Sequence, residues 1–318
     1  MKTKQLKILK LVTPLALAAL LVPAISNGFP TDTNTYIVNS VEVGSFTFAD
    51  PSGPANNASH PDWATATAAD VPLEYIIFAS ANAYGGFDNW AKVNPEAARL
   101  LSVKSIHDGE EILFRVEYAD ATYDENAHDT PRFFDALALL IPYSGVGWEH
   151  CKAGPTSEPL IHMGMRCDGL DEHGDECPPG EENNCKCCPT NIHFWRPDKV
   201  EVENIVTNGM GTTLETSETD DPTLFHASQG WENGVWTVVM GRAMVGPPPG
   251  EEHPDATHVG PGGYMVTLDA GQSYDTVWGN WDGSRNERNG SKFIGLWGTL
   301  NICTGNQASC PPWTPPLP

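Results

Sequence analysis

The sequence contains little positive charge. Its 18 lysine and arginine residues stand against 41 aspartate and glutamate residues, which gives a formal net charge of -23 at pH 7. A chain with this balance is repelled by phosphate backbones, which argues against a nucleic acid as its partner. The acidity is compatible with a basic protein partner, and it equally serves solubility alone.

Long apolar segments are absent after the first 26 residues. The basic stretch Lys2–Lys10, the apolar stretch Leu11–Ala24 and the cleavage-type sequence Ala24-Ile25-Ser26 are typical of a secretory signal peptide. An uncleaved anchor is the alternative, but the apolar stretch is shorter than the roughly 20 residues that a spanning helix needs. We therefore predict a signal peptide at residues 1–26 and a periplasmic or otherwise extracytoplasmic mature protein without a transmembrane segment.

A Cys-x-x-Cys-His sequence is missing, which argues against covalent attachment of a c-type haem. All eight cysteines lie in the predicted mature part, and an even number in an oxidising compartment favours disulfides. Cys303 and Cys310 flank a short loop that one bond would close. The other six crowd one segment, and their spacing fits neither a usual zinc site nor a usual iron–sulfur site. We predict four disulfides and no metal cluster.

Helical periodicity is scarce, and the two short segments that show it are Asn94–Leu101 and Arg132–Leu140. Strand patterns are frequent instead. Glu110–Tyr118 alternates apolar and polar residues, and Asn233-Gly234 is a strong hairpin turn between two strand-like runs. Further strands are predicted at 263–268 and 293–302, joined by turns rich in Gly and Pro.

These patterns predict an all-β fold, specifically an antiparallel β-sandwich with long loops and a few short helices. Residues 27–318 are expected to form a single domain. Residues 167–190 look like an acidic, cysteine-rich insertion, and residues 303–318 like a C-terminal extension. The carboxylates of the insertion could bind calcium, although a solvated loop pinned by disulfides explains them more simply.

Lys292 is the most informative single residue. In the predicted strand it shares parity with Ile294, Leu300 and Ile302, so its side chain is expected on an apolar, inward face. A lysine that enters a core must find a partner or give up its charge. A neutral amine is a good metal ligand, so Lys292 is a candidate metal ligand.

A second candidate ligand lies in the sequence His162-Met163-Gly164-Met165. The glycine after Met163 would let a ligand approach the backbone closely. A methionine is more often core filler, and a lone histidine is usually structural. Sulfur from Met163 and an amine from Lys292 would suit a haem, but spacing alone does not bring them together.

The chain resembles the haem b-binding γ subunits of the type II dimethyl-sulfoxide-reductase family. That family includes ethylbenzene dehydrogenase, dimethylsulfide dehydrogenase, the nitrate, selenate and chlorate reductases, and nitrite oxidoreductase. The resemblance spans most of residues 60–302 and rests on segments in a fixed order, namely Asp62-Trp63, Val103–Gly109, Phe134–Ala138, His162–Gly164, Asn191–Arg196, Gly209–Thr212, Gly230–Val239 and Trp281–Trp297.

The resemblance implies a β-sandwich that holds one b haem in a pocket between loops and sheet. It places the axial methionine on Met163 and the axial lysine on Lys292, which follows Glu287-Arg288 in the last segment. The acidic insertion comes directly after the Met-Gly sequence, so His162 and Met165 remain alternatives for the first ligand. With both axial positions filled by protein, such a haem would transfer electrons and not bind a substrate.

The function that the resemblance implies is a non-catalytic electron-transfer subunit. It would relay electrons between the iron–sulfur subunit of a periplasmic molybdenum oxidoreductase complex, which also holds a molybdenum catalytic subunit, and a soluble cytochrome c. The competing hypothesis is a secreted carbohydrate-binding-type β-sandwich module without haem, which would use exposed tryptophans. A hydrolase has little support, because no Ser-His-Asp or paired-carboxylate arrangement can be identified from the residue order.

Overall fold

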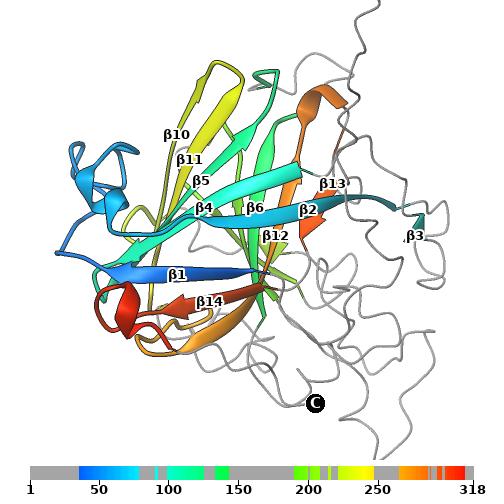
Figure 1. Ribbon diagram of the computed structural model, residues 1–318. Coiled ribbons are helices and arrows are strands. Elements are labelled where there is room, and N and C mark those ends of the chain that lie inside the picture. The colour runs from blue at the N-terminus through cyan, green and yellow to red at the C-terminus, as the bar shows by residue number, and fades with distance from the viewer. Residues whose placement is uncertain are drawn as a thin grey trace, which may run out of the picture.

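The computed structural model describes residues 36–78, 90–91, 99–124, 133–142, 190–199, 201–207, 214–215, 221–246, 265–285, 287, 292–295 and 298–311. Within these ranges the chain forms strands and three short 3-10 helices (Figure 1). None of the helices in this part of the chain is long and apolar enough to cross a membrane.

The strands follow one another with few helical interruptions. They are β1 (Ile37–Glu42), β2 (Ala69–Phe78), β3 (Trp90–Ala91), β4 (Arg99–His107), β5 (Glu111–Ala119), β6 (Ala136–Pro142), β7 (Thr190–Trp195), β8 (Glu203–Thr207), β9 (Leu214–Glu215), β10 (Phe225–Glu232), β11 (Val235–Ala243), β12 (Ser273–Trp281), β13 (Lys292–Gly295) and β14 (Gly298–Ile302). The 3-10 helices are η1 (Pro61–Ala64), η6 (Gly283–Arg285) and η7 (Gln307–Ser309). The predicted all-β class is confirmed.

One hydrogen-bonded path runs β10-β11-β5-β4-β1-β14-β12-β6-β7-β8-β9. Its two ends fold over one another as a sandwich-like arrangement. We call strands β10, β11, β5 and β4 the β5 layer, and strands β12, β6, β7, β8 and β9 the β6 layer. The sheet is mixed, not purely antiparallel as predicted, because β1 runs parallel to both β14 and β4.

The two layers are joined twice. β4 pairs with β1 and β12 pairs with β14, and β1 and β14 pair with each other. β4 and β12 are also linked through β2 and β13, which pair antiparallel. Figure 1 shows β1 beside β14 and β2 beside β13. These two joins fix the positions of β2 and β13, the strands around Lys292.

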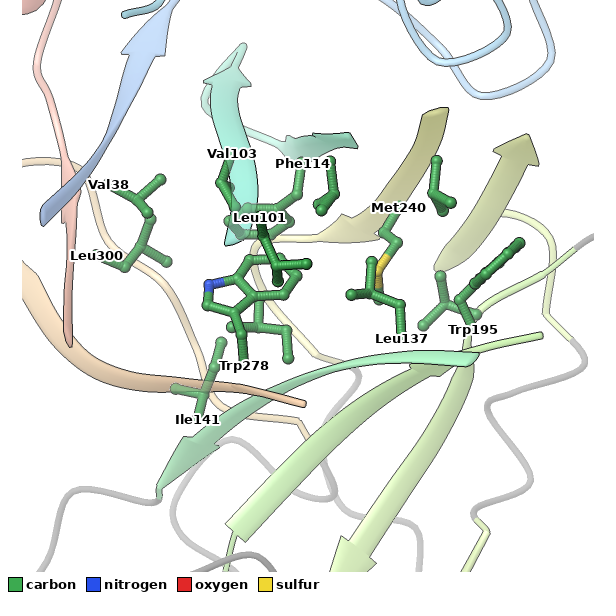
Figure 2. Close-up of a cluster of buried hydrophobic side chains, with 14 of the residues drawn as sticks. Val38, Leu101, Val103, Phe114, Leu137, Ile141, Trp195, Met240, Trp278 and Leu300 are labelled. Carbon is green, nitrogen blue, oxygen red and sulfur yellow. The ribbon is translucent and has the colours of Figure 1, made fainter. Parts of the chain in front are cut away.

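The main core fills the space between the layers. Leu101, Val103, Phe114 and Met240 from the β5 layer face residues of the β6 layer (Figure 2), including Leu137, Ile141, Trp195 and Trp278. Every second residue of β6 and β12 points into this core, as strand geometry requires. Trp195 and Trp278 are almost fully buried, so these two tryptophans serve packing and are not exposed for ligand stacking.

Each layer also has a buried outer face. On the β5 layer, Ile106, Leu113 and Val239 pack against Phe48 and Trp63 of the segment before β2. On the β6 layer, the remaining residues of β6, β7, β12 and β13 form a third apolar cluster, which contains Ala136, Ala138, Leu140, Ile192, Val277, Trp281 and Ile294. This outer face of the β6 layer carries Lys292.

Three predicted elements differ from the structure. Arg132–Leu140 is not a helix, because residues 136–142 form β6 between β7 and β12. Asn94–Leu101 is not a helix over its described part, where residues 99–101 belong to β4. An apolar run buried on both faces fits either structure, and pairing with neighbours overrides the helix preference of Ala and Leu. Residues 265–268 contain no strand in the structure.

The turns and the C-terminal segment agree better with the predictions. Asn233 and Gly234 have φ of 53° and 79° in the β10–β11 hairpin, the left-handed conformations that such a turn demands. Cys303 and Cys310 form the predicted local disulfide. The Cys303 amide donates to Ser40 and Gly305 accepts from Glu42, so the described start of the extension is tied to β1.

Candidate functional site

Lys292 opens β13 and is buried, with 6% of its surface exposed. β13 pairs with β12 on one side and with β2 on the other. The predicted burial is therefore confirmed, but the face is different from the one predicted. The predicted strand is divided into β13 and β14, and Lys292 shares its face with Ile294 on the outer side of the β6 layer, whereas Leu300 and Ile302 point into the main core.

The Lys292 amine has an aromatic neighbour and, among the described residues, no carboxylate partner. Its Nζ lies 5.0 Å from the centre of the Trp281 ring, and the edge of Trp281 meets Phe194 at 5.4 Å between ring centres. Burial lowers the pKa of Lys292 from 10.5 to about 8. Removing its proton at pH 7 therefore costs roughly 1.4 kcal/mol, compared with roughly 4.8 kcal/mol for an ordinary lysine.

Small residues lie on the outer face of β6 and β12. Ala138 pairs with Gly279 and Ala136 with Trp281 across these two strands. A Cβ added to Gly279 would lie 3.4 Å from the Trp281 ring, so the indole lies over this glycine. Lys292 is therefore a buried, easily neutralised amine against an indole ring, which is the chemical form that binds a metal.

A buried ionic network holds the turn that leads from β12 to Lys292. The Asp282 amide donates to Glu287 Oε2 at 2.8 Å. Arg99 of β4 lies 3.2 Å from Asp282 and 3.9 Å from Glu287. Burial raises the pKa of Glu287 to about 7, against the lowering effect of Arg99. This network stabilises the described residues that follow β12, at 282–285 and 287.

Sequence reasoning did not assign a role to Arg99, Asp282 or Glu287. A signal was present, because Glu287 lies in the last of the ordered segments. It was not interpretable from the sequence, since Arg99 is 183 residues away from Asp282. The pairing depends on β4 and β12 both being linked to the β2–β13 pair.

Other predicted site residues lie outside the described residues. These are Met163 and its alternatives His162 and Met165, together with the insertion at 167–190 and the signal peptide at 1–26. The structure thus places Lys292 against Trp281, and the assignment of both axial ligands stays a prediction. The three disulfides expected beyond Cys303–Cys310 stay predictions as well.

The structure defines an all-β protein with a buried lysine that has no carboxylate partner among the described residues. Residues 60–223, just over half of the chain, match the family model described as ethylbenzene dehydrogenase. The chain belongs to this family, which confirms the resemblance predicted from the ordered segments. The matched range includes residue 163 but ends before Lys292, so the case for Lys292 depends on its burial and electrostatics.

A relative from Haloferax mediterranei is 25% identical over 260 residues, covering 81% of this chain and 71% of that protein. It is described as a candidate heme subunit of a respiratory nitrate reductase.

Two solved structures share the outline of the chain at low similarity. A family 9 carbohydrate binding module from Caldicellulosiruptor kristjanssonii, solved with glucose, aligns with a TM-score of 0.38 at 8% identity, over 85% of this chain and 97% of that one. A candidate carbohydrate-binding protein from Bacteroides uniformis aligns with a TM-score of 0.42 at 10% identity, over 83% and 97%. Likeness at this level carries no argument about the ligand.

Proposed function

We propose that this protein is a haem-carrying electron-transfer subunit of a respiratory oxidoreductase complex, and not itself the catalytic subunit. Family membership and the description of the Haloferax relative support this function. The observation that carries it is Lys292, a buried lysine with a lowered pKa and, among the described residues, no carboxylate to pair with. Burial favours the neutral form of this amine, which is the form that binds a metal.

The residues present fit a haem. Lys292 would supply one axial ligand as a neutral amine, and Met163 the other. Ala136 and Ala138 would present small apolar side chains on the same outer face. Because the chain has no Cys-x-x-Cys-His sequence, the haem would be held without a covalent bond, as a b-type haem. A haem with two protein ligands supplies one-electron transfer and has no open position for substrate.

The chain's own residues would favour loss of the proton from the Lys292 amine. Burial already brings the pKa of Lys292 to about 8, and binding to iron would displace the remaining proton. Trp281 lies against the amine and is itself packed edge-on against Phe194, which limits the contact of the amine with water. We propose that the ion pairs of Asp282 and Glu287 with Arg99 help to position β13.

The partners follow from the function. An electron-transfer subunit needs a donor and an acceptor, and we propose the iron–sulfur subunit of a molybdenum oxidoreductase complex and a soluble cytochrome c. The complex would operate in the periplasm, or another extracytoplasmic space, as the predicted signal peptide requires. The net charge of -23 suits a basic cytochrome, and salt would weaken that association.

Optical and EPR spectra of the purified holoprotein test this proposal. We expect a low-spin b-type spectrum, and complete extraction of the haem by acid and acetone. Lys292→Leu should abolish the low-spin signal, because leucine cannot bind iron and Met163 alone leaves one axial position open. Met163→Ala should do the same. Lys199→Leu is the matched control, because this half-buried lysine pairs with Glu201 and Glu203, and Glu203 keeps Arg196 as its closer partner.

Two outcomes would contradict the assignment in different ways. If His162→Ala or Met165→Ala removes the low-spin signal and Met163→Ala does not, the first ligand is wrong and the function stands. If folded protein supplied with haem shows no Soret band and binds a polysaccharide, the function is wrong and the carbohydrate-binding alternative is correct.

A further inference from the structure

Three buried aspartates meet at one end of the two layers. Asp120 follows β5, Asp135 precedes β6 and Asp282 follows β12. One carboxylate oxygen from each lies within 4.8 Å of the others, and all three residues are less than a tenth exposed. Like charges this close in a buried site are unfavourable unless something neutralises them.

Positive charge from the described residues is too small to do so. Arg99 is shared, since it lies 3.2 Å from Asp282 and 3.9 Å from Glu287. Arg285 approaches Glu287 at 3.5 Å from a position that is 47% exposed. Within the described ranges, one buried guanidinium therefore faces four buried carboxylates, which are those of Asp120, Asp135, Asp282 and Glu287.

The donors around Asp135 favour its ionised form. Its Oδ1 accepts from the Gly283 amide at 2.9 Å. Its Oδ2 accepts from the Asp124 amide and from Trp236 Nε1, both at 3.0 Å. Three N–H donors on two oxygens suit a carboxylate, which only accepts. Gly283 is required here, because an added Cβ would lie 1.9 Å from the Phe133 carbonyl oxygen.

Two buried oxygen atoms at the cluster have no hydrogen-bond partner. Asp120 uses Oδ1 for the Thr122 amide and hydroxyl, while its Oδ2 has no partner. Tyr118, which is 2% exposed, has an unpartnered hydroxyl beside the Asn280 side chain. The charges of Asp135 and Asp120 both raise the pKa of that hydroxyl, after burial as the main cause. Tyr118 is therefore close to the cluster.

We propose that Asp120, Asp135 and Asp282 bind a calcium ion, with Asp120 Oδ2 as a ligand and Tyr118 at the edge of the site. Calcium takes oxygen ligands at about 2.3–2.6 Å in flexible geometry. Two oxygens on one calcium ion are therefore at most about 5 Å apart, which the three carboxylates satisfy. Water would supply further ligands.

Bound protons are the competing way to neutralise the cluster. Burial raises the pKa of Asp135 to about 7, with Asp120 adding to the rise and the Gly283 amide opposing it. The three N–H donors on Asp135 favour its ionised form, however, which favours a cation over a proton. The ion would join the β5 layer to the β6 layer and fix Asp282, the residue that begins the turn toward Lys292.

Calcium binding to the full-length chain tests this site. After removal of divalent ions, calcium titration by calorimetry and thermal unfolding by circular dichroism are measured with and without EDTA. With calcium 100-fold above its Kd, we expect the Tm to rise by roughly 5–10 °C. Terbium should compete with calcium and emit when tryptophan is excited, because Trp236 contacts the ligand Asp135.

Asp120→Asn is the decisive variant. The oxygen of the asparagine side chain can still accept the hydrogen bonds from Thr122, but the negative charge that would bind calcium is removed. The variant should lose the calcium-dependent rise in Tm while matching or exceeding the wild type in EDTA. Asp221→Asn is the control, because Asp221 only caps Thr223 at the surface. Equal calcium responses in wild type and Asp120→Asn would overturn the proposal and assign any binding to another site, such as the insertion at 167–190. An absence of any calcium response would overturn it in favour of protons.

Discussion

Two cationic side chains, Arg99 and Lys292, lie on opposite faces of β13, and they differ in whether a carboxylate neutralises their charge. On the inner side, the Arg99 guanidinium lies 4.2 Å from the centre of the Phe293 ring and pairs with Asp282 and Glu287. On the outer side, Lys292 lies against Trp281 and, among the described residues, has no counter-charge. Arginine stays charged in proteins and must be paired, whereas lysine can release its proton. The paired cation is structural, and the unpaired one is available as a ligand.

Removal of the paired cation should have the largest effect on folding. We expect Arg99→Met to lower the free energy of unfolding by roughly 3–5 kcal/mol, because it leaves the carboxylates of Asp282 and Glu287 buried without their partner. Urea unfolding followed by tryptophan fluorescence measures this. Lys199→Met, which breaks a surface pair, should lower it by no more than about 1 kcal/mol. Equal effects of the two variants would remove the basis of the comparison.

Removal of the unpaired cation should act in the opposite direction on haem-free protein. Lys292→Leu removes an amine whose pKa is lowered by burial from 10.5 to about 8, which corresponds to a penalty of up to roughly 3 kcal/mol at pH 7. Loss of the contact with Trp281 offsets part of this gain. We therefore expect the variant to unfold at higher urea without haem, and to lose haem binding. A variant that is less stable in both forms would mean that Lys292 is structural.

The pH dependence of stability sharpens the same point. The folded-state pKa of Lys292 is about 8, below its ordinary value, so between pH 8 and 10.5 the unfolded chain holds a proton that the folded chain has released. Stability of the haem-free protein therefore rises through this window and is lost as pH falls toward 8. At pH 7 the haem-free wild type should have a lower free energy of unfolding than Lys292→Leu, and most of this difference should disappear by pH 10.5. Parallel pH profiles for the two proteins would contradict the lowered pKa.

Glu287→Gln should have the smallest effect. Glutamine keeps an oxygen to accept from the Asp282 amide, and Arg99 retains its closer partner Asp282. We expect a loss of about 1 kcal/mol in the free energy of unfolding. The variant loses the long ion pair between Arg99 and Glu287, but it also removes the cost of burying the Glu287 charge. Urea unfolding measures the loss, and a change in the haem spectrum would show that the turn also positions Lys292. A loss as large as that of Arg99→Met would show that Glu287, and not Asp282, is the main partner.

Local patterns predicted much of the architecture. Alternation gave the β5 strand and the burial of Lys292, Asn233-Gly234 gave a hairpin, and the short Cys303–Cys310 loop gave a disulfide. The two failed helix predictions have one cause, which is that segments rich in Ala and Leu do not reveal the strands that pair with them. Residues 136–142 form a strand because β7 and β12 pair with them on both sides.

The candidate site shows the same division. The sequence by itself determined that Lys292 is buried and that the chain belongs to its family, because alternation and ordered segments are local properties. Only the tertiary structure decided that Lys292 faces outward from the β6 layer, that Arg99 holds its turn, and that Asp120, Asp135 and Asp282 meet. Those contacts depend on strand register and on the two joins between the layers. Register is set by the sum of many long-range pairings, which no single segment of the sequence records.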